Sequence, residues 1–180
     1  MIYINFAAAI DPKTSQNLMA CLADQINKGE WEIYILFSSG GGSVYSGVTL
    51  HNYLRSLPIK LIMHNIGVVD SIANVVFLAG SERYAVPNSS FLFHGVGFDI
   101  IQPTRFEEKQ VKDRLLSIER DQNLISEIIA ENSQLSLEKT REMFLETKTL
   151  TPEEAKTVGI IQDIREAKIP KGTNIISFVF

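Results

Sequence analysis

The sequence predicts an α/β fold with a largely parallel sheet. Through the first half of the chain, short runs rich in β-branched and aromatic residues alternate with helical patterns. The second half begins with a long helical pattern instead. Strands that alternate with helices favour parallel pairing, because each helix returns the chain to the start of the next strand. The 180 residues contain no repeat or linker, so we expect one domain, residues 1–180.

Three strands and two helices are expected before residue 66. The strands are IYINF, EIYILFSS and IKLIMHN, at residues 2–6, 32–39 and 59–65. The pair Asp11-Pro12 begins the first helix in the order typical of a cap and first turn. The second helix is expected at residues 43–55, directly after three glycines.

The next segment, GVVDSIANVVFLAG at residues 67–80, is typical of a turn that leads into a buried helix. RYAVPNSSFLFHG, residues 83–95, then predicts short strands around a Pro87-Asn88 turn. Near the C-terminus, Thr151 and Glu154 form a capping box that begins a helix, which we expect to end at Gly159. A shorter helix at residues 137–145 and closing strands IIQDI and NIISFVF complete the set.

A long helix is predicted between these two groups. Thr104 and Glu107 form a capping-box pattern, and helical spacing continues to about Ala130. Such a helix is about 40 Å long, which exceeds what a small domain needs. Its narrow apolar stripe predicts pairing beyond its own domain, although an ordinary core helix fits the pattern as well. The stripe consists of Val111, Leu115, Ile118, Ile125 and Ile129.

The composition excludes several classes of protein. A net charge of -4 without a Lys/Arg run predicts no nucleic-acid partner. Cys21 is the only cysteine, so no disulfide framework or cysteine metal site is expected, and we expect no cofactor. The chain has no signal-peptide pattern and no apolar run of the ~20 residues that a membrane span needs. We therefore expect a cytoplasmic protein without a membrane partner.

Three features suggest nucleophilic chemistry. The glycines of SSGGGSV, residues 38–44, can expose main-chain N–H groups to an oxyanion, although a merely flexible turn explains them too. Ser71 precedes an apolar helix, where it is either a nucleophile or an N-cap. Histidine is the usual general base for serine. We expect His51 on the surface, while His64 and His94 each end a strand, and the pattern alone does not choose between them.

The order of these motifs resembles the Clp protease proteolytic-subunit family, serine peptidases on a crotonase-like fold. The matching segments are SSGGGSVYSG, GVVDSIANVVFLAG, PNSSFLFH and LTPEEAKTVGIIQDI. They follow the family's order, and the resemblance as a whole extends over nearly the entire chain. The resemblance implies a β-β-α spiral with a protruding handle helix. The head would comprise residues 1–102 and 147–180, and the handle residues 103–146.

The same resemblance implies a serine endopeptidase acting on peptides or unfolded proteins. Ser71 falls on the family's nucleophile and His94 on its general base, while Gly42 and Ile72 fall on its two oxyanion amides. It also implies a homo-oligomeric ring, a heptamer or double heptamer joined through the handles. An ATPase partner is doubtful on this reading, because the first strand begins at Ile2 and leaves no residues for the family's N-terminal axial segment.

The main departure from the family concerns the acid of the triad. Thr147 stands where the family has aspartate, and losing that acid can cost on the order of 10⁴ in rate. Glu146 or Glu142 could substitute, or a Ser–His dyad could work with a main-chain carbonyl or Thr147 holding the ring. Asp70 is also unusual, since the family has a small apolar residue before its serine.

These departures keep other functions open. A catalytically weak or inactive ring subunit with an assembly or regulatory role is the alternative. An acyl-CoA enzyme of the crotonase type is a third reading, but residues 67–80 offer no suitably placed pair of glutamates.

Overall fold

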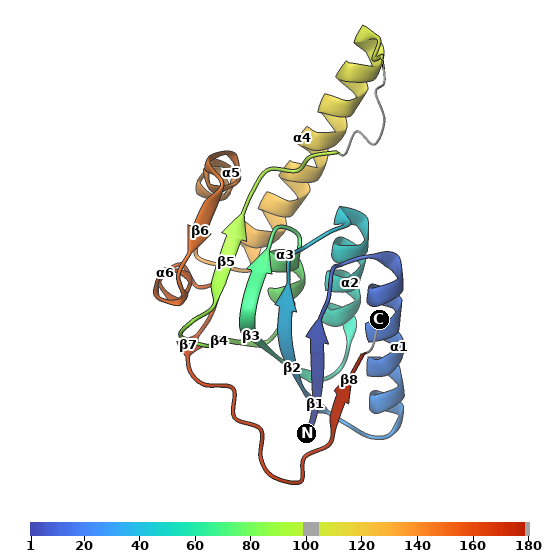
Figure 1. Ribbon diagram of the computed structural model, residues 1–180, viewed down its shortest axis with the longest axis vertical. Coiled ribbons are helices and arrows are strands. Elements are labelled where there is room, and N and C mark those ends of the chain that lie inside the picture. The colour runs from blue at the N-terminus through green and yellow to red at the C-terminus, as the bar shows by residue number, and fades with distance from the viewer. Residues whose placement is uncertain (99–104, 179–180) are drawn as a thin grey trace.

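The computed structural model describes residues 1–98 and 105–178. It has a central sheet and a long helix that projects from it (Figure 1), which confirms the predicted α/β class. The strands are β1 (Ile2–Ala7), β2 (Glu32–Ser39), β3 (Lys60–Asp70), β4 (Glu82–Ala85), β5 (Ser90–Phe93), β6 (Lys148–Leu150), β7 (Asp163–Ile164) and β8 (Ile175–Ser177). The helices are α1 (Pro12–Asn27), α2 (Val44–Ser56), α3 (Ala73–Phe77), α4 (Glu108–Glu131), α5 (Leu137–Glu146) and α6 (Pro152–Thr157).

The described strands form one sheet in the order β6-β5-β3-β2-β1-β8, with β4 beside β3 and β7 beside β4. Their pairings are parallel except between β5 and β6. β4 and β5 follow one another in the chain, yet each pairs with a different part of β3. The turn at Pro87-Asn88 thus moves the chain along β3 and does not close a hairpin.

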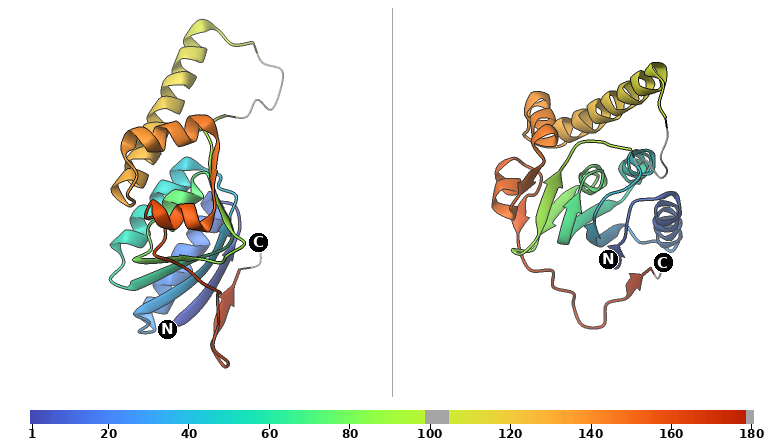
Figure 2. Two further views of the ribbon diagram at one scale, coloured as in Figure 1. Left: turned by 90° about the vertical axis from the view of Figure 1, so that its left-hand side faces the viewer. Right: turned by 45° about the horizontal axis from the view of Figure 1, so that its top comes forward.

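Two apolar clusters lie on opposite faces of the sheet. Helices α1, α2 and α3 cover one face (Figure 2), where Phe77 of α3 meets the ring of Phe91 edge-on at 5.4 Å between centroids. The other face carries the smaller cluster of Tyr3, Tyr34, Leu36 and Ile62. Ala167 and Ile169, in the segment between β7 and β8, pack over this cluster.

The segment around Ser71 differs from the sequence expectation. β3 continues to Asp70, so residues 67–70 are strand and form no turn. The helix that follows has only five residues. β3 is a central strand, with β2 on one side and β4 and β5 on the other. Such a strand can include glycine and aspartate, because pairing with its neighbours outweighs the low strand propensity of these residues.

The long helix is confirmed, but its predicted start is not observed. Glu107 caps α4 by a reciprocal pair of hydrogen bonds with Gln110, and Thr104 lies outside the described residues. The inner half of α4 is buried through Ile125 and Ile129, whereas Val111 and Leu115 on the outer half are exposed. The apolar stripe therefore covers the core at one end only.

Candidate active site

The candidate site lies where three parallel strands end. Gly40 follows β2, Ser71 follows β3 and His94 follows β5, and all three residues line a cavity of about 390 Å³. The carboxyl ends of parallel strands meet at one edge of a sheet, which is where such folds usually bind ligands. Residues 95–98 form the remaining wall of this cavity with Gly42 and Val44. No motif in the sequence indicated residues 96–98, because they follow the histidine strand without a recognisable pattern.

Ser71 occupies an unusual backbone conformation. Its φ is 56°, in the left-handed region that side chains other than glycine rarely adopt. The Ser71 N–H donates to the carbonyl of Leu92 at 2.8 Å, and the Asn74 amide donates to the carbonyls of Ser71 and Leu92. Such strain persists only where surrounding contacts enforce it, and it concentrates at functional sites.

The capping alternative for Ser71 is not observed. Ile72, not Ser71, is the N-cap of α3, and no side chain in the described part of the chain caps that helix. Within the described part of the chain, the Ser71 hydroxyl forms no hydrogen bond. The hydroxyl is therefore free to react in the cavity.

The glycine turn packs directly against Ser71. A Cβ built on Gly41 would lie 2.8 Å from the Cβ of Ser71, and one on Gly42 would lie 2.3 Å from the carbonyl oxygen of Ile10. The turn is fixed by two hydrogen bonds, from the Ile10 N–H to the Gly41 carbonyl and from the Ser43 N–H to the Ile10 carbonyl. Glycine is required at both positions because no side chain fits.

This packing leaves two main-chain donors beside the serine. Among the described residues, the N–H groups of Gly42 and Ile72 have no hydrogen-bond acceptor. A pair of fixed, unengaged amides next to a nucleophile can stabilise the negative oxygen of a tetrahedral intermediate. They are also the two amides that the family resemblance implies for the oxyanion.

His94 is the histidine that shares the cavity with Ser71. Its Nδ1 lies 3.0 Å from the carbonyl oxygen of Gly95, and no hydrogen bond joins its ring to Ser71 in the described residues. Catalytic hydrogen bonds are often longer in the free enzyme and shorten when substrate binds.

The other two histidines are buried away from this cavity. His64 bonds Tyr34 and the Arg165 carbonyl, so it is not the cavity histidine. His51, expected on the surface, is only 6% exposed and bonds the Val75 carbonyl at 2.7 Å. The expectation for His51 was wrong because its helix face packs on α3 and not on solvent.

Thr147 ends α5 in a left-handed conformation. In the β5–β6 ladder, Phe93 pairs with Lys148, so continuing the antiparallel register by one step puts Thr147 opposite His94. β6 begins only at Lys148, so the observed ladder ends one step before Thr147 and His94.

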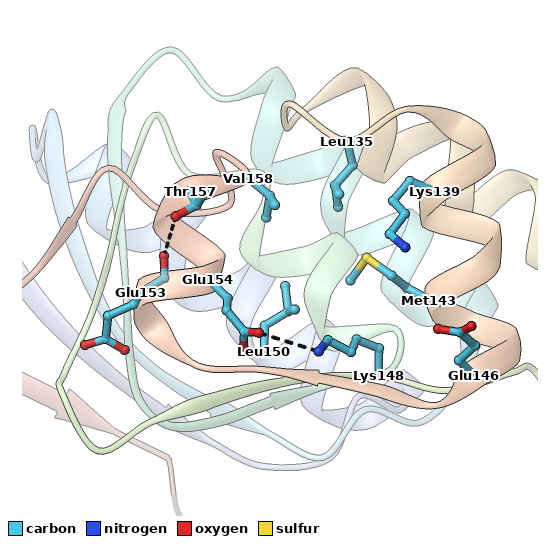
Figure 3. Close-up of a pocket in the computed structure, with 10 residues that line it drawn as sticks. All are labelled: Leu135, Lys139, Met143, Glu146, Lys148, Leu150, Glu153, Glu154, Thr157 and Val158. Carbon is cyan, nitrogen blue, oxygen red and sulfur yellow. Dashed lines mark hydrogen bonds and ion pairs between the residues drawn. The ribbon is translucent and has the colours of Figure 1, made fainter.

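Glu146 and Glu142, the two glutamates considered as substitute acids, are not part of the β5–β6 ladder. Glu146 lines a separate cavity of about 460 Å³ together with Lys148, whose ammonium pairs with Glu154 (Figure 3). The Glu142 carboxylate accepts a hydrogen bond from Lys139 at 2.7 Å. Glu142 is thus paired with Lys139, and Glu146 lines a cavity other than the one that contains His94.

Asp70 is the last residue of β3 and directly precedes Ser71. It is half-buried, and its Cα is the ladder partner of Leu92, two residues before His94. Burial raises the pKa of Asp70, while the main chain of Leu92 and the charge of His94 partly oppose this increase. One oxygen, Oδ1, is buried and has no hydrogen-bond partner among the residues that the structure describes.

Other kinds of site receive no support from the described residues. No group of three or more His, Cys, Asp or Glu side chains there is arranged to hold a metal ion. Within the same residues, no helix is both long and apolar enough to cross a membrane.

A serine in a constrained turn, a neighbouring histidine and two free amides are typical of hydrolases with a serine nucleophile. Comparison with known proteins agrees with this class. The model of the Clp protease family matches residues 2–168, and the chain belongs to that family. This membership supports a peptidase role in general.

Curated relatives have the same family name. The chain is 29% identical over 162 residues to an ATP-dependent Clp protease proteolytic subunit of Bacteroides fragilis, a match that covers 86% of this chain and 74% of the relative. It is 28% identical to the protein of the same name in Bacteroides thetaiotaomicron, covering 86% of this chain and 70% of the relative.

Proposed function

We propose that this chain is a serine endopeptidase that cleaves peptide bonds through an acyl-enzyme on Ser71. The observation that carries the proposal is the strained Ser71 turn, with its free hydroxyl in one cavity with His94. Nothing in ordinary folding favours a left-handed serine over glycine at this point. Keeping the hydroxyl at the cost of that strain is expected of a nucleophile.

In the proposed reaction, Ser71 Oγ attacks the carbonyl carbon of the peptide while His94 takes the hydroxyl proton. The N–H groups of Gly42 and Ile72 stabilise the resulting oxyanion. His94 then gives the proton to the leaving amine, and the acyl-enzyme forms. Water, deprotonated by His94, hydrolyses the ester and restores Ser71.

The test is covalent labelling with a fluorophosphonate, which Ser71 Oγ attacks with loss of fluoride. We expect one label per chain, on Ser71, and none on Ser71→Ala. His94→Ala should lower the labelling rate by at least 10²-fold, because it removes the general base. Ser46→Ala, which changes an α2 serine outside the cavity lining, is the matched control. A folded, assembled protein that does not react would contradict the proposal.

The second candidate is a catalytically weak or inactive subunit of a ring. The observation that favours it is the His94 ring, which bonds the Gly95 carbonyl through Nδ1. The resemblance also puts a threonine, Thr147, where the family has its acid. Short peptide substrates distinguish the two candidates, because their cleavage needs no unfolding. The term "ATP-dependent" in the relatives' names applies to those proteins, and the proposal here is limited to peptide hydrolysis.

We also propose that the chain assembles into a homo-oligomeric ring, a heptamer or a pair of heptamers. The exposed Val111 and Leu115 on the outer half of α4 support this proposal, since α4 extends beyond the sheet (Figure 1). The division into a head and a handle, as expected from the sequence, belongs to the same proposal.

A further inference from the structure

We propose that Asp70, immediately before the nucleophile, provides the negative charge that stabilises protonated His94, in place of the acid missing at Thr147. This inference rests on the proposed peptidase function. It makes Asp70 a positioning residue, because its carboxylate acts on His94 and not on the substrate.

The first support is the strand register. Asp70 pairs with Leu92 in the parallel β3–β5 ladder, and Leu92 pairs with Thr149 in the antiparallel β5–β6 ladder. Partners in a ladder have their side chains on one face, and alternate residues along a strand share that face. Asp70, Leu92 and Thr149 therefore form one row. His94 directly follows the last residue of β5, and continuing the alternation of that strand by one residue puts it on the face of Asp70.

The second support is the state of the Asp70 carboxylate. Its Oδ1 is buried and has no hydrogen-bond partner within residues 1–98 and 105–178. A buried acceptor left without a donor destabilises the folded protein, so its presence in a native structure calls for an explanation such as a function. An imidazolium beside Asp70 would satisfy this charge.

The third support is that the other charged groups around His94 are engaged elsewhere. On β6 and α5, Lys148 pairs with Glu154 and Glu142 pairs with Lys139, while Glu146 lines the outer cavity (Figure 3). On α4, Arg120 pairs with Asp121 and bonds Tyr45. The charge of His94 also lowers the pKa of Asp70, although burial, the larger effect, raises it.

The opposite effect of Asp70 is also physically possible. A fixed negative charge one residue from the nucleophile could repel the oxyanion and slow the reaction. The direction of the rate change on removing the charge separates the two roles, because a charge that stabilises His94 accelerates the reaction and one that repels the oxyanion slows it.

The experiment measures the rate of fluorophosphonate labelling of Ser71 between pH 5 and 10 in the wild type, Asp70→Asn and Asp70→Glu. Asp70→Asn should react at least tenfold more slowly, and the midpoint of its pH profile should move to lower pH, because the imidazolium loses its counter-charge. Asp70→Glu, which keeps the charge, should retain the wild-type midpoint. Asp24→Asn on α1, a carboxylate paired with Lys28 at the surface, is the matched control and should change neither value.

A rescue variant makes the test specific. Thr147→Asp restores an acid opposite His94, and aspartate tolerates the left-handed conformation of that position. In the Asp70→Asn background it should recover most of the lost rate and return the midpoint upward. If Asp70 had a purely structural role, Thr147→Asp would not recover the labelling rate that Asp70→Asn loses.

The outcomes separate this inference from the proposed function. If the wild type is labelled on Ser71 and Asp70→Asn reacts equally fast with an unchanged midpoint, the role of Asp70 is wrong and the peptidase remains. An accelerated Asp70→Asn would assign the charge to the oxyanion instead, and a slow Glu146→Gln with a normal Asp70→Asn would assign the acid to Glu146. A wild type that is not labelled at all would contradict the peptidase itself.

Discussion

Gly41 packs against Ser71 so closely that a methyl group on Gly41 would lie 2.8 Å from the Ser71 Cβ and 2.8 Å from the Asp70 carbonyl oxygen. This contact joins the turn after β2 to the turn after β3. It also determines where the Gly42 N–H lies relative to the serine, so the glycine turn has a function in positioning as well as in chain reversal.

Gly41→Ala should therefore abolish labelling of Ser71. The alanine adds left-handed strain at φ 88° and a clash with main chain, together about 2–4 kcal/mol of lost stability or a displaced turn. Gly29→Ala is the matched control, since Gly29 has φ 90° but no described residue comes within 4 Å of a new Cβ there. It should cost about 1 kcal/mol and leave the labelling rate per folded molecule unchanged. Equal labelling of both variants would contradict the packing argument.

The strain at Ser71 predicts an order of stability among variants without the hydroxyl. Ser71→Gly should be more stable than Ser71→Ala by about 0.5–1 kcal/mol in urea denaturation, because glycine adopts φ 56° without strain. Ser46 lies within α2, where the order should reverse by about 1 kcal/mol in favour of alanine. The same preference for alanine at both serines would mean that Ser71 is not strained in solution.

The sequence predicted most elements because their signals are local. Asp11-Pro12, Thr151 with Glu154 and the apolar stripe of α4 each act over one or two helical turns, and the structure contains all three helices. The extension of β3 to Asp70 could not be predicted in this way. It depends on pairing with β5, which is distant in the chain, and glycine and aspartate are poor strand formers on their own.

The site was predictable in part for the same reason. Ser71 and the glycines form recognisable local patterns, but the choice of His94 over His64 depends on burial, and burial depends on the whole sheet. Tyr34 and the segment around Arg165 enclose His64 from opposite ends of the chain. The neighbourhood of Asp70 and His94 likewise follows from strand register, which no short motif specifies.

The buried histidines predict loss of stability in mild acid. Burial lowers the pKa of His64 and of His51, so both are neutral in the folded protein. As pH falls through the unfolded value of about 6.5, the unfolded chain binds protons that the folded chain does not. The free energy of unfolding should therefore fall between pH 7 and 5, by up to about 1.4 kcal/mol per pH unit for each group.

Thermal melts at a series of pH values check this prediction. His64→Gln removes one titrating group while keeping a donor and an acceptor for Arg165 and Tyr34. Its melting temperature should depend less on pH between 7 and 5 than that of the wild type, and His51→Gln should flatten the dependence further. An unchanged slope in both variants would mean that neither histidine is kept neutral by the fold.

The outer half of α4 predicts how assembly can be broken. Leu115 is 53% exposed on the part of α4 that projects from the sheet, and an exposed apolar stripe on a helix is stable in water when another copy covers it. Leu115→Glu should shift the protein from oligomers to smaller species in light scattering at micromolar concentration, since burying an unpaired carboxylate in the contact costs several kcal/mol.

Leu145→Glu on α5, where the leucine is 83% exposed, adds the same charge away from the stripe and should leave the mass unchanged. Because Leu115 is exposed in the single chain, the variant should melt at the temperature of the isolated wild-type subunit. A wild type that is already a monomer at this concentration, or a Leu115→Glu oligomer of full mass, would show that the stripe on α4 is not the contact surface.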